Sequence, residues 1–252
     1  MITLNRINLS VAAVALAIVT PRASADQIRM HTDAGISGTT IATTQGLSTI
    51  SHSGGNYFAE VVDTVTNPDL SGVLANYASV AKGNAHSNYA FWTFCIEINE
   101  SFSSEGLYNV SLSNAAVNGG YSGGNPDPIS NATARLYSLF ATGQMSSLVG
   151  GFVYGAAGGA DVQEAIWYLE GEDSVLNRSG ASSIIAALGA SFNSNSNYTG
   201  SAVRVMNLTN TTSPYTNRQS QLVYVGVPDG GSSLLLLGLG LAGLGVLSRR
   251  RR

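Results

Sequence analysis

The C-terminal segment, residues 227–252, constrains the chain most strongly, because it joins an apolar run to a block of four arginines. Residues 232–248 are polar only at their ends, so we expect a membrane-spanning helix there. At about 1.5 Å per residue this helix would be about 25 Å long, which is a short span. Arg249 to Arg252 cannot cross the bilayer and are expected to stay in the cytoplasm. The rest of the chain is therefore expected to lie outside the cytoplasm.

An extended, turn-prone motif precedes the apolar run: Val227, Pro228, Asp229, Gly230 and Gly231. The order of motif, apolar run and arginines resembles the C-terminal sorting signal of the PEP-CTERM/exosortase system of Gram-negative bacteria. The resemblance is closest to the variant whose tail begins V-P-D-S-G, and Gly230 stands where that variant has serine. It implies processing by an exosortase-like enzyme and a final location at the cell surface or in the extracellular matrix. An ordinary C-terminal membrane anchor is the alternative.

The N-terminus predicts export as well. Arg6 forms a basic n-region, residues 9–19 form an apolar h-region, and Ala23-Ser24-Ala25 is a cleavage site of the A-x-A type. We therefore expect a signal peptide at residues 1–25, an extracellular domain at residues 26–226 and the sorting signal at residues 227–252.

Composition limits what this extracellular domain can bind. Six of the twelve basic residues lie outside residues 26–229, whereas all 15 acidic residues lie within them, so this part of the chain carries nine more acidic than basic residues. The absence of a basic patch argues against nucleic acid as a partner. Cys95 is the only cysteine and cannot form a disulfide within the chain. Its thiol is expected to be buried and inert, paired with another chain, or chemically occupied.

Hydrophobic periodicity divides the extracellular domain into three parts. Helical spacing is found in the middle of the chain, at residues 129–142, 160–170 and 182–192. Strand-like runs rich in β-branched and aromatic residues flank it, at residues 27–32, 57–66, 88–99, 106–113, 202–208 and 220–225. This order predicts an α+β fold, an antiparallel β-sandwich with a helical insertion, in which the closing strands return to the first sheet. The Gly-rich segment at residues 118–128 is expected to be a connector.

The predicted strand at residues 88–99 contains the cysteine. In its F-W-T-F-C-I-E-I run, strand alternation places four residues on the core face: Trp92, Phe94, Ile96 and Ile98. Thr93, Cys95 and Glu97 then point to the other, more polar face. A purely structural cysteine would more naturally lie on the core side, so we expect the sulfur of Cys95 to face another group.

The second candidate segment is the helix predicted at residues 160–170. Asp161 and Glu164 have the D-x-x-E spacing of a capping box, which predicts Asp161 as the N-cap. Gln163 would then lie in the first turn, where backbone N–H groups lack partners within the helix. Gln163 and Trp167 are four residues apart and share one helix face.

The aromatic-Cys-Ile-acid strand and the hydrophobic-Gln-x-Ala-Ile-Trp helix together resemble bacterial surface thioester domains, over residues 91–169. In that family the Gln side chain acylates the Cys sulfur with loss of ammonia. The resemblance implies a thioester between Cys95 and Gln163, with Glu97, Asp161 and Trp167 as supporting residues and Trp167 as a shield. It also implies a covalent adhesin that captures an amine on a surface protein or glycan.

Physical chemistry is consistent with such a bond. A thioester is an activated acyl group that lasts only while water is excluded. Its formation passes through an oxyanion, which the N–H groups and the positive dipole at a helix start could stabilise. A chain that carries this electrophile benefits from few lysines, and Lys82 is the only one.

Two other interpretations remain open. Cys95 could be an inert buried residue in a non-reactive structural matrix protein with the same tail. The three histidines, His31, His52 and His86, could serve Cys95 as the base of a cysteine hydrolase, but their polar contexts favour surface or turn residues. Because no metal-ligand spacing, phosphate loop or nucleophile elbow appears, we expect no metal, no cofactor and no enzymatic turnover.

Overall fold

The structure is a computed structural model. It describes residues 26–32, 39–45, 48–54, 57–63, 70, 72–85, 88–189 and 196–226. The predicted signal peptide, the sorting motif and the membrane helix at residues 232–248 lie outside these residues. Within the described part of the chain, no helix has the length and apolar character needed to cross a membrane.

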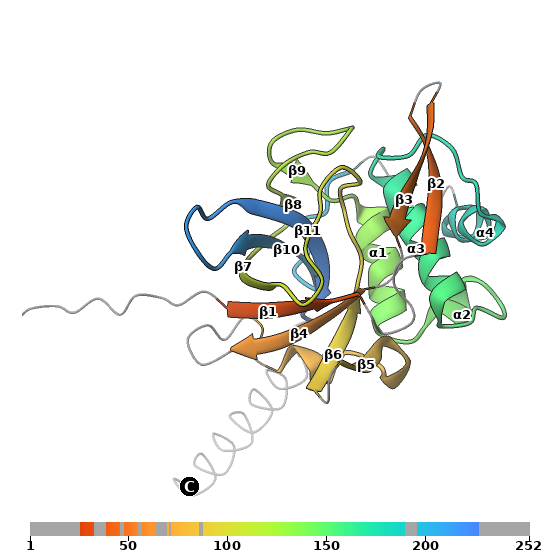
Figure 1. Cartoon of the computed structure of the whole chain (residues 1–252). Helices are drawn as coiled ribbons and strands as arrows, with labels where there is room; N and C mark the ends of the chain where they lie inside the picture. Colours follow the sequence, from red (N-terminus) through yellow and green to blue (C-terminus); the bar gives the residue numbers. More distant parts are fainter. Residues whose placement is uncertain are drawn as a thin grey trace, which may run out of the picture.

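One antiparallel sheet of seven strands forms the larger part of the domain (Figure 1). Its order is β11-β10-β7-β1-β4-β6-β5. The strands are β1 (Asp26–His31), β4 (Tyr57–Asp63), β5 (Lys82–Ala85), β6 (Asn88–Thr93), β7 (Leu107–Ser113), β10 (Val203–Asn210) and β11 (Asn217–Tyr224). The closing strands β10 and β11 therefore return to the first sheet, as predicted. All six predicted strands are confirmed; β5 was not predicted.

The sheet closes on itself at residues 94–98, which we call the seam segment. This segment continues from β6 but pairs with β11, at the opposite end of the sheet: Leu222 N–H donates to Phe94 O at 3.1 Å, and Ile96 N–H donates to Ser220 O at 3.1 Å. Cys95 and Gln221 form the bridge between these two bonds. The predicted sandwich of two sheets is therefore wrong. Residues 88–98 change pairing partner after Thr93, and this change makes one closed sheet where two separate sheets were expected.

Between β7 and β10 the described residues form four helices, which confirms the predicted helical insertion. They are α1 (Asn131–Ala141), α2 (Met145–Leu148), α3 (Ala156–Leu169) and α4 (Ser179–Leu188). Helix α1 starts where Ser130 accepts a hydrogen bond from the N–H of Thr133, an ordinary N-cap. Two short 3-10 helices, Val73–Asn76 and Ser79–Ala81, precede β5.

Two small strand pairs were not predicted. β2 (Thr39–Gln45) and β3 (Ser48–Gly54) form a hairpin that contacts α3, and β8 (Ala115–Ala116) pairs with β9 (Asp127–Pro128). The hairpin is rich in Ser and Thr, and its sequence has little of the hydrophobic alternation that indicates a strand. The short β8–β9 pair is too brief for any periodic signal.

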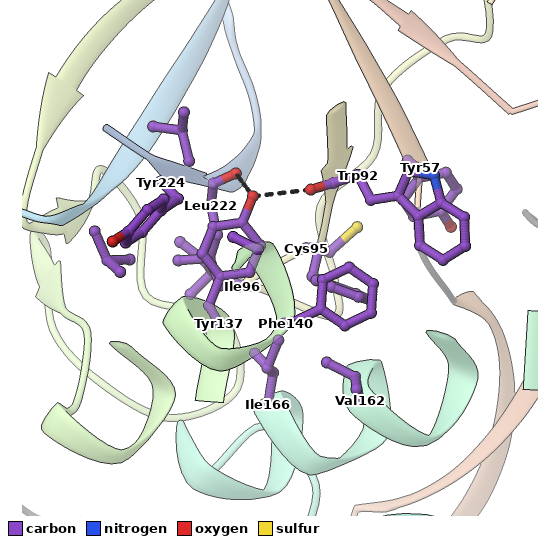
Figure 2. Packing of buried hydrophobic residues seen from close by; sticks show 14 of the residues in the cluster. Tyr57, Trp92, Cys95, Ile96, Tyr137, Phe140, Val162, Ile166, Leu222 and Tyr224 are labelled. Atoms are coloured by element: carbon purple, nitrogen blue, oxygen red, sulfur yellow. Dashed lines mark hydrogen bonds between the residues drawn. The ribbon is translucent and has the colours of Figure 1, made fainter. Parts of the chain in front are cut away.

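Aromatic residues fill the space between the sheet and α1. Phe140 of α1 stacks edge-to-face with Phe94 at a centroid distance of 4.8 Å and lies 5.6 Å from Trp92. The hydroxyl of Tyr137 lies 2.9 Å from Trp92 O and 3.1 Å from Leu222 O, so it spans both strands of the closure (Figure 2). This packing holds the seam segment between the sheet and the helices.

Candidate functional site

Cys95 lies in the middle of the seam segment and is fully buried. Opposite residues of an antiparallel pair alternate between hydrogen-bonded and non-hydrogen-bonded pairs. Because the ladder bonds to β11 are made by Phe94 and Ile96, Cys95 and Gln221 form a non-hydrogen-bonded pair. The N–H and C=O of Cys95 therefore point away from β11 and need another partner.

Gln163 of α3 supplies that partner. Its Oε1 accepts the Cys95 N–H at 2.9 Å, and its Nε2 donates to Cys95 O at 2.8 Å. Gln163 is itself fully buried. The side-chain amide thus pairs with the main chain of Cys95 as a neighbouring strand would. The structure brings together the two residues that the sequence singled out.

The sulfur of Cys95 faces a third residue that sequence reasoning missed. Gln221 of β11 donates from Nε2 to Cys95 Sγ at 3.3 Å, and Gln221 is fully buried. The sulfur therefore faces a specific group, as expected, and that group is polar. The predicted polar face of the strand is itself buried, since every residue from Phe91 to Ile98 is buried. Nothing local in the sequence of β11 indicates that Gln221 meets Cys95, because the two residues lie 126 positions apart.

The surroundings keep the Cys95 thiol neutral. Burial raises the pKa of Cys95 to about 12, and the hydrogen bond from Gln221 lowers it by a smaller amount. Tyr57 lies on the same side, where burial and then the proximity of Cys95 raise its pKa. Figure 2 shows the sulfur pointing toward Tyr57 and Trp92. A neutral, fully buried thiol is slow to react with external reagents.

The predicted start of α3 is wrong. The helix begins at Ala156 with Gly155 as its N-cap, and no side chain caps it. Asp161 and Gln163 therefore lie well inside the helix. The small Gly and Ala residues before Asp161 extend the helix without any capping signal. Gln163 accordingly has no unpaired first-turn N–H groups beside it, and the predicted role of the helix dipole in stabilising an oxyanion is removed.

Asp161 and Glu164 instead hold the start of the next helix, α4. Glu164 accepts hydrogen bonds from the backbone N–H groups of Asn177 at 2.8 Å and Arg178 at 2.9 Å. Asp161 forms an ion pair of 2.6 Å with Arg178. The D-x-x-E pair thus satisfies N–H groups ahead of α4. An open cavity of about 480 Å³ borders Asp161 and Gly180, but neither Cys95 nor Gln163 lines it.

Glu97 lies two residues beyond Cys95 and is fully buried. Its Oε2 accepts the N–H of Gly120, and its Oε1 has no hydrogen-bond partner within the described residues. Burial, followed by the repulsion of Glu172 and Asp127, raises the pKa of Glu97 to about 9. Glu97 is therefore a neutral acid at pH 7.

The Gly-rich segment at residues 118–128 folds over the carboxyl groups of Glu97 and Glu172. Glu172 accepts hydrogen bonds from the backbone N–H groups of Ile98 at 3.1 Å, Tyr121 at 3.0 Å and Ser122 at 2.9 Å. The expected connector is therefore an ordered covering that joins the seam segment to the end of α3. Trp167 is 1% exposed and belongs to the same hydrophobic core as Cys95, while its predicted role as a shield stays a prediction.

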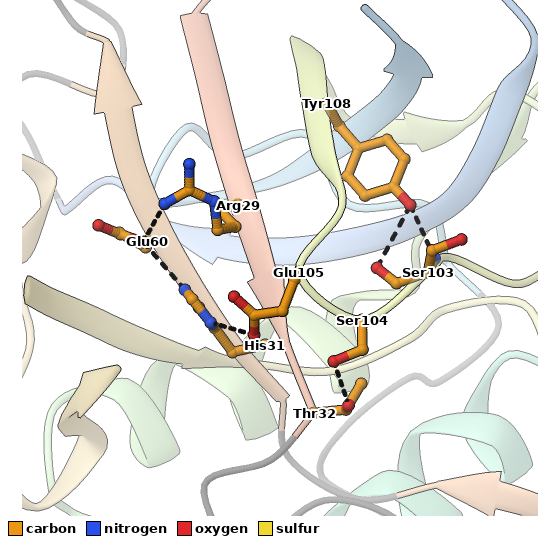
Figure 3. Close-up of polar contacts among 8 residues, drawn as sticks. All are labelled: Arg29, His31, Thr32, Glu60, Ser103, Ser104, Glu105 and Tyr108. Atoms are coloured by element: carbon orange, nitrogen blue, oxygen red, sulfur yellow. Dashed lines mark hydrogen bonds and ion pairs between the residues drawn. The ribbon is translucent and has the colours of Figure 1, made fainter. Parts of the chain in front are cut away.

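The histidines do not form a catalytic pair with Cys95 in the described residues. His31 is fully buried, so the prediction of a surface or turn residue is wrong. Its Nδ1 lies 2.8 Å from Glu105 Oε1 and its Nε2 lies 3.0 Å from Glu60 Oε2 (Figure 3). Arg29 pairs with the same Glu60 oxygen at 3.3 Å. His52 falls in β3, and His86 lies outside the described residues. In the part of the chain that the structure describes, no group of His, Cys, Asp and Glu could hold a metal ion.

Comparison with known proteins identifies the C-terminus. Residues 226–251 match the VPDSG-CTERM motif, which confirms the predicted sorting signal despite Gly230. No curated protein and no solved structure matches the chain. The motif indicates an exported protein of the cell envelope and processing by an exosortase-like enzyme. The chain therefore carries a PEP-CTERM-like sorting tail of the VPDSG-CTERM type.

Proposed function

We propose that this exported protein is a covalent adhesin, which captures amines through an internal thioester between Cys95 and Gln163. The observation that carries the proposal is the placement of the Gln163 amide on Cys95, with both of its polar atoms hydrogen-bonded to the main chain of that residue. The sorting tail supports a location where a captured partner would be met, at the cell surface or in the extracellular matrix.

The hydrogen bonds of Gln163 suit the first step. Sγ of Cys95 attacks Cδ of Gln163, and negative charge develops on Oε1. The Cys95 N–H already points at that oxygen from 2.9 Å, so it serves as the oxyanion donor in place of the helix start. The C–S bond forms, the C–N bond breaks, and Nε2 leaves as ammonia with the thiol proton. Because Nε2 donates to Cys95 O, the leaving group is held in place before the reaction.

Capture reverses the chemistry at sulfur. An amine nitrogen attacks Cδ of residue 163, the C–S bond breaks, and Cys95 takes up the proton as a thiol. An amide then tethers the partner, which is an amine on a protein or a glycan. Both Cys95 and Gln163 are fully buried, which would protect the thioester from water between these events. Because the chain has one lysine, Lys82, its own amines offer little competition.

The competing function is a non-reactive structural protein of the extracellular matrix with the same tail. One observation favours it: by pairing with the Cys95 N–H and C=O, Gln163 already satisfies two buried backbone groups, a complete structural role. The raised pKa of the Cys95 thiol also fits an inert cysteine.

Labelling with methylamine separates the two functions. The purified chain is incubated with isotopically labelled methylamine and then mapped by peptide mass spectrometry, with Cys95→Ser as the control. The adhesin predicts label on residue 163 and a free thiol on Cys95, and no label in the control. The wild-type chain is also labelled after unfolding, because burial then no longer limits access of methylamine to residue 163. If residue 163 carries no label even in this sample, the adhesin proposal fails and the structural function remains.

A further inference from the structure

We infer that Gln221 takes part in the capture reaction together with Cys95 and Gln163. Its side chain donates a hydrogen bond to the Cys95 sulfur and stabilises the thiolate that leaves when the thioester is opened. The inference rests on the proposed function, because it assigns a role in the same reaction. It concerns a residue of β11 that belongs to neither of the two motifs found in the sequence.

The closed sheet places Gln221 directly across from Cys95. The two residues form an antiparallel bridge that lacks ladder bonds of its own, and side chains of such pairs approach most closely. Nε2 of Gln221 reaches Sγ at 3.3 Å, and both side chains are fully buried. A buried donor aimed at sulfur acts in a low dielectric, where a hydrogen bond to an anion is strong.

The carbonyl end of the Gln221 amide faces Thr93, whose hydroxyl lies 3.5 Å from Oε1 and donates its proton to the closer acceptor, Leu222 O, at 2.6 Å. The nitrogen end of the amide faces Cys95, where Nε2 lies 3.3 Å from Sγ.

The two glutamines approach Cys95 from different elements and contact different atoms. Gln163 comes from α3 and pairs with the main chain of Cys95, whereas Gln221 comes from β11 and contacts Sγ alone. In capture, the electron pair of the breaking C–S bond moves to Sγ, where the N–H of Gln221 meets the developing charge. Gln221 is not consumed: its amide bond stays intact while that of residue 163 is exchanged.

A matched pair of variants tests this role. Gln221→Leu removes the donor to sulfur. Gln219→Leu makes the same substitution two residues earlier on β11, where the amide donates to Glu97 O at 2.8 Å and does not contact sulfur. We expect Gln221→Leu to slow methylamine uptake by about ten- to a hundredfold, the loss that follows from removing a hydrogen bond to a charged group. Gln219→Leu is expected to retain the wild-type rate.

A second readout does not depend on the thioester. Because Cys95 is the only cysteine, the infrared S–H stretching band of the chain belongs to one thiol. In the Gln163→Ala background, which cannot form the thioester, Gln221→Leu should shift this band and Gln219→Leu should leave it unchanged. Equal uptake rates for wild type and Gln221→Leu, or an unshifted band, would overturn the inference. A wild-type chain with no missing ammonia would overturn the thioester itself, and the band would still decide whether Gln221 binds the thiol.

Discussion

The buried carboxyl of Glu97 makes a pH-dependent contribution to stability that one substitution should remove. In the folded chain Glu97 has a pKa of about 9, against 4.5 for an ordinary glutamate. Between these values the folded chain keeps the proton of Glu97 and the unfolded chain has released it. Folding therefore takes up a proton, and the free energy of unfolding falls as the pH rises through this window.

The size of the effect follows from the window. One proton bound on folding gives a slope of about 1.4 kcal/mol per pH unit. Between pH 5.5 and 7.5 Glu97 should thus lower the free energy of unfolding by about 2–3 kcal/mol. Glu97→Gln keeps an oxygen that accepts the N–H of Gly120 and removes the titration. The variant should therefore be the more stable chain at pH 7.5, with a smaller difference at pH 5.5.

Urea unfolding of both chains across this pH range measures the difference in slope. Other buried carboxyls with raised pKa values, such as Glu170 and Glu164, contribute equally to both chains and cancel. The difference should persist in high salt, because a buried group is poorly screened. Parallel pH profiles for wild type and Glu97→Gln would refute the assignment of a neutral Glu97.

Two packing predictions concern the same region. Gly120→Ala should lower the free energy of unfolding by about 1–3 kcal/mol, because the added Cβ would collide with the carboxyls of Glu172 and Glu97. Gly150→Ala, whose added Cβ meets nothing within 4 Å, is the control in the same urea unfolding experiment. Equal stability of the two variants would contradict the tight packing around Gly120. Tyr137→Phe should cost about 1–3 kcal/mol by the same measurement, because it removes the hydroxyl that spans Trp92 O and Leu222 O. Tyr215→Phe, at a tyrosine that is 67% exposed, should be neutral, and a neutral Tyr137→Phe would argue against a role in closing the sheet.

Local sequence patterns predicted the elements well and their assembly less well. Alternation located the six long strands, and helical spacing located α1, α3 and α4, because both signals arise within one element. The closure of the sheet depends on residues 94–98 pairing with β11, more than a hundred positions away, and no local pattern contains that pairing. The same distance in sequence explains why Gln221 escaped notice.

The start of α3 was predicted wrongly for a different reason. Asp161 and Glu164 have the spacing of a capping box, yet they hold the backbone before α4. The pattern correctly indicated an acidic residue that accepts backbone N–H groups near a helix start. In the folded chain, however, these N–H groups precede α4 and do not belong to the first turn of α3. The pairing of Cys95 with Gln163 was anticipated only through the resemblance of two short motifs, and their contact is the part of the site that the sequence predicted.

The intact mass of the purified, untreated chain shows whether the thioester between Cys95 and Gln163 has formed. We expect the wild-type chain to be lighter than its sequence by one ammonia, and Cys95→Ala and Gln163→Ala each to have their full sequence mass. The deficit should be located on a peptide in which Cys95 is joined to residue 163. A wild-type chain of full sequence mass with a titratable thiol after unfolding would contradict the thioester and leave Gln163 as a structural partner of Cys95.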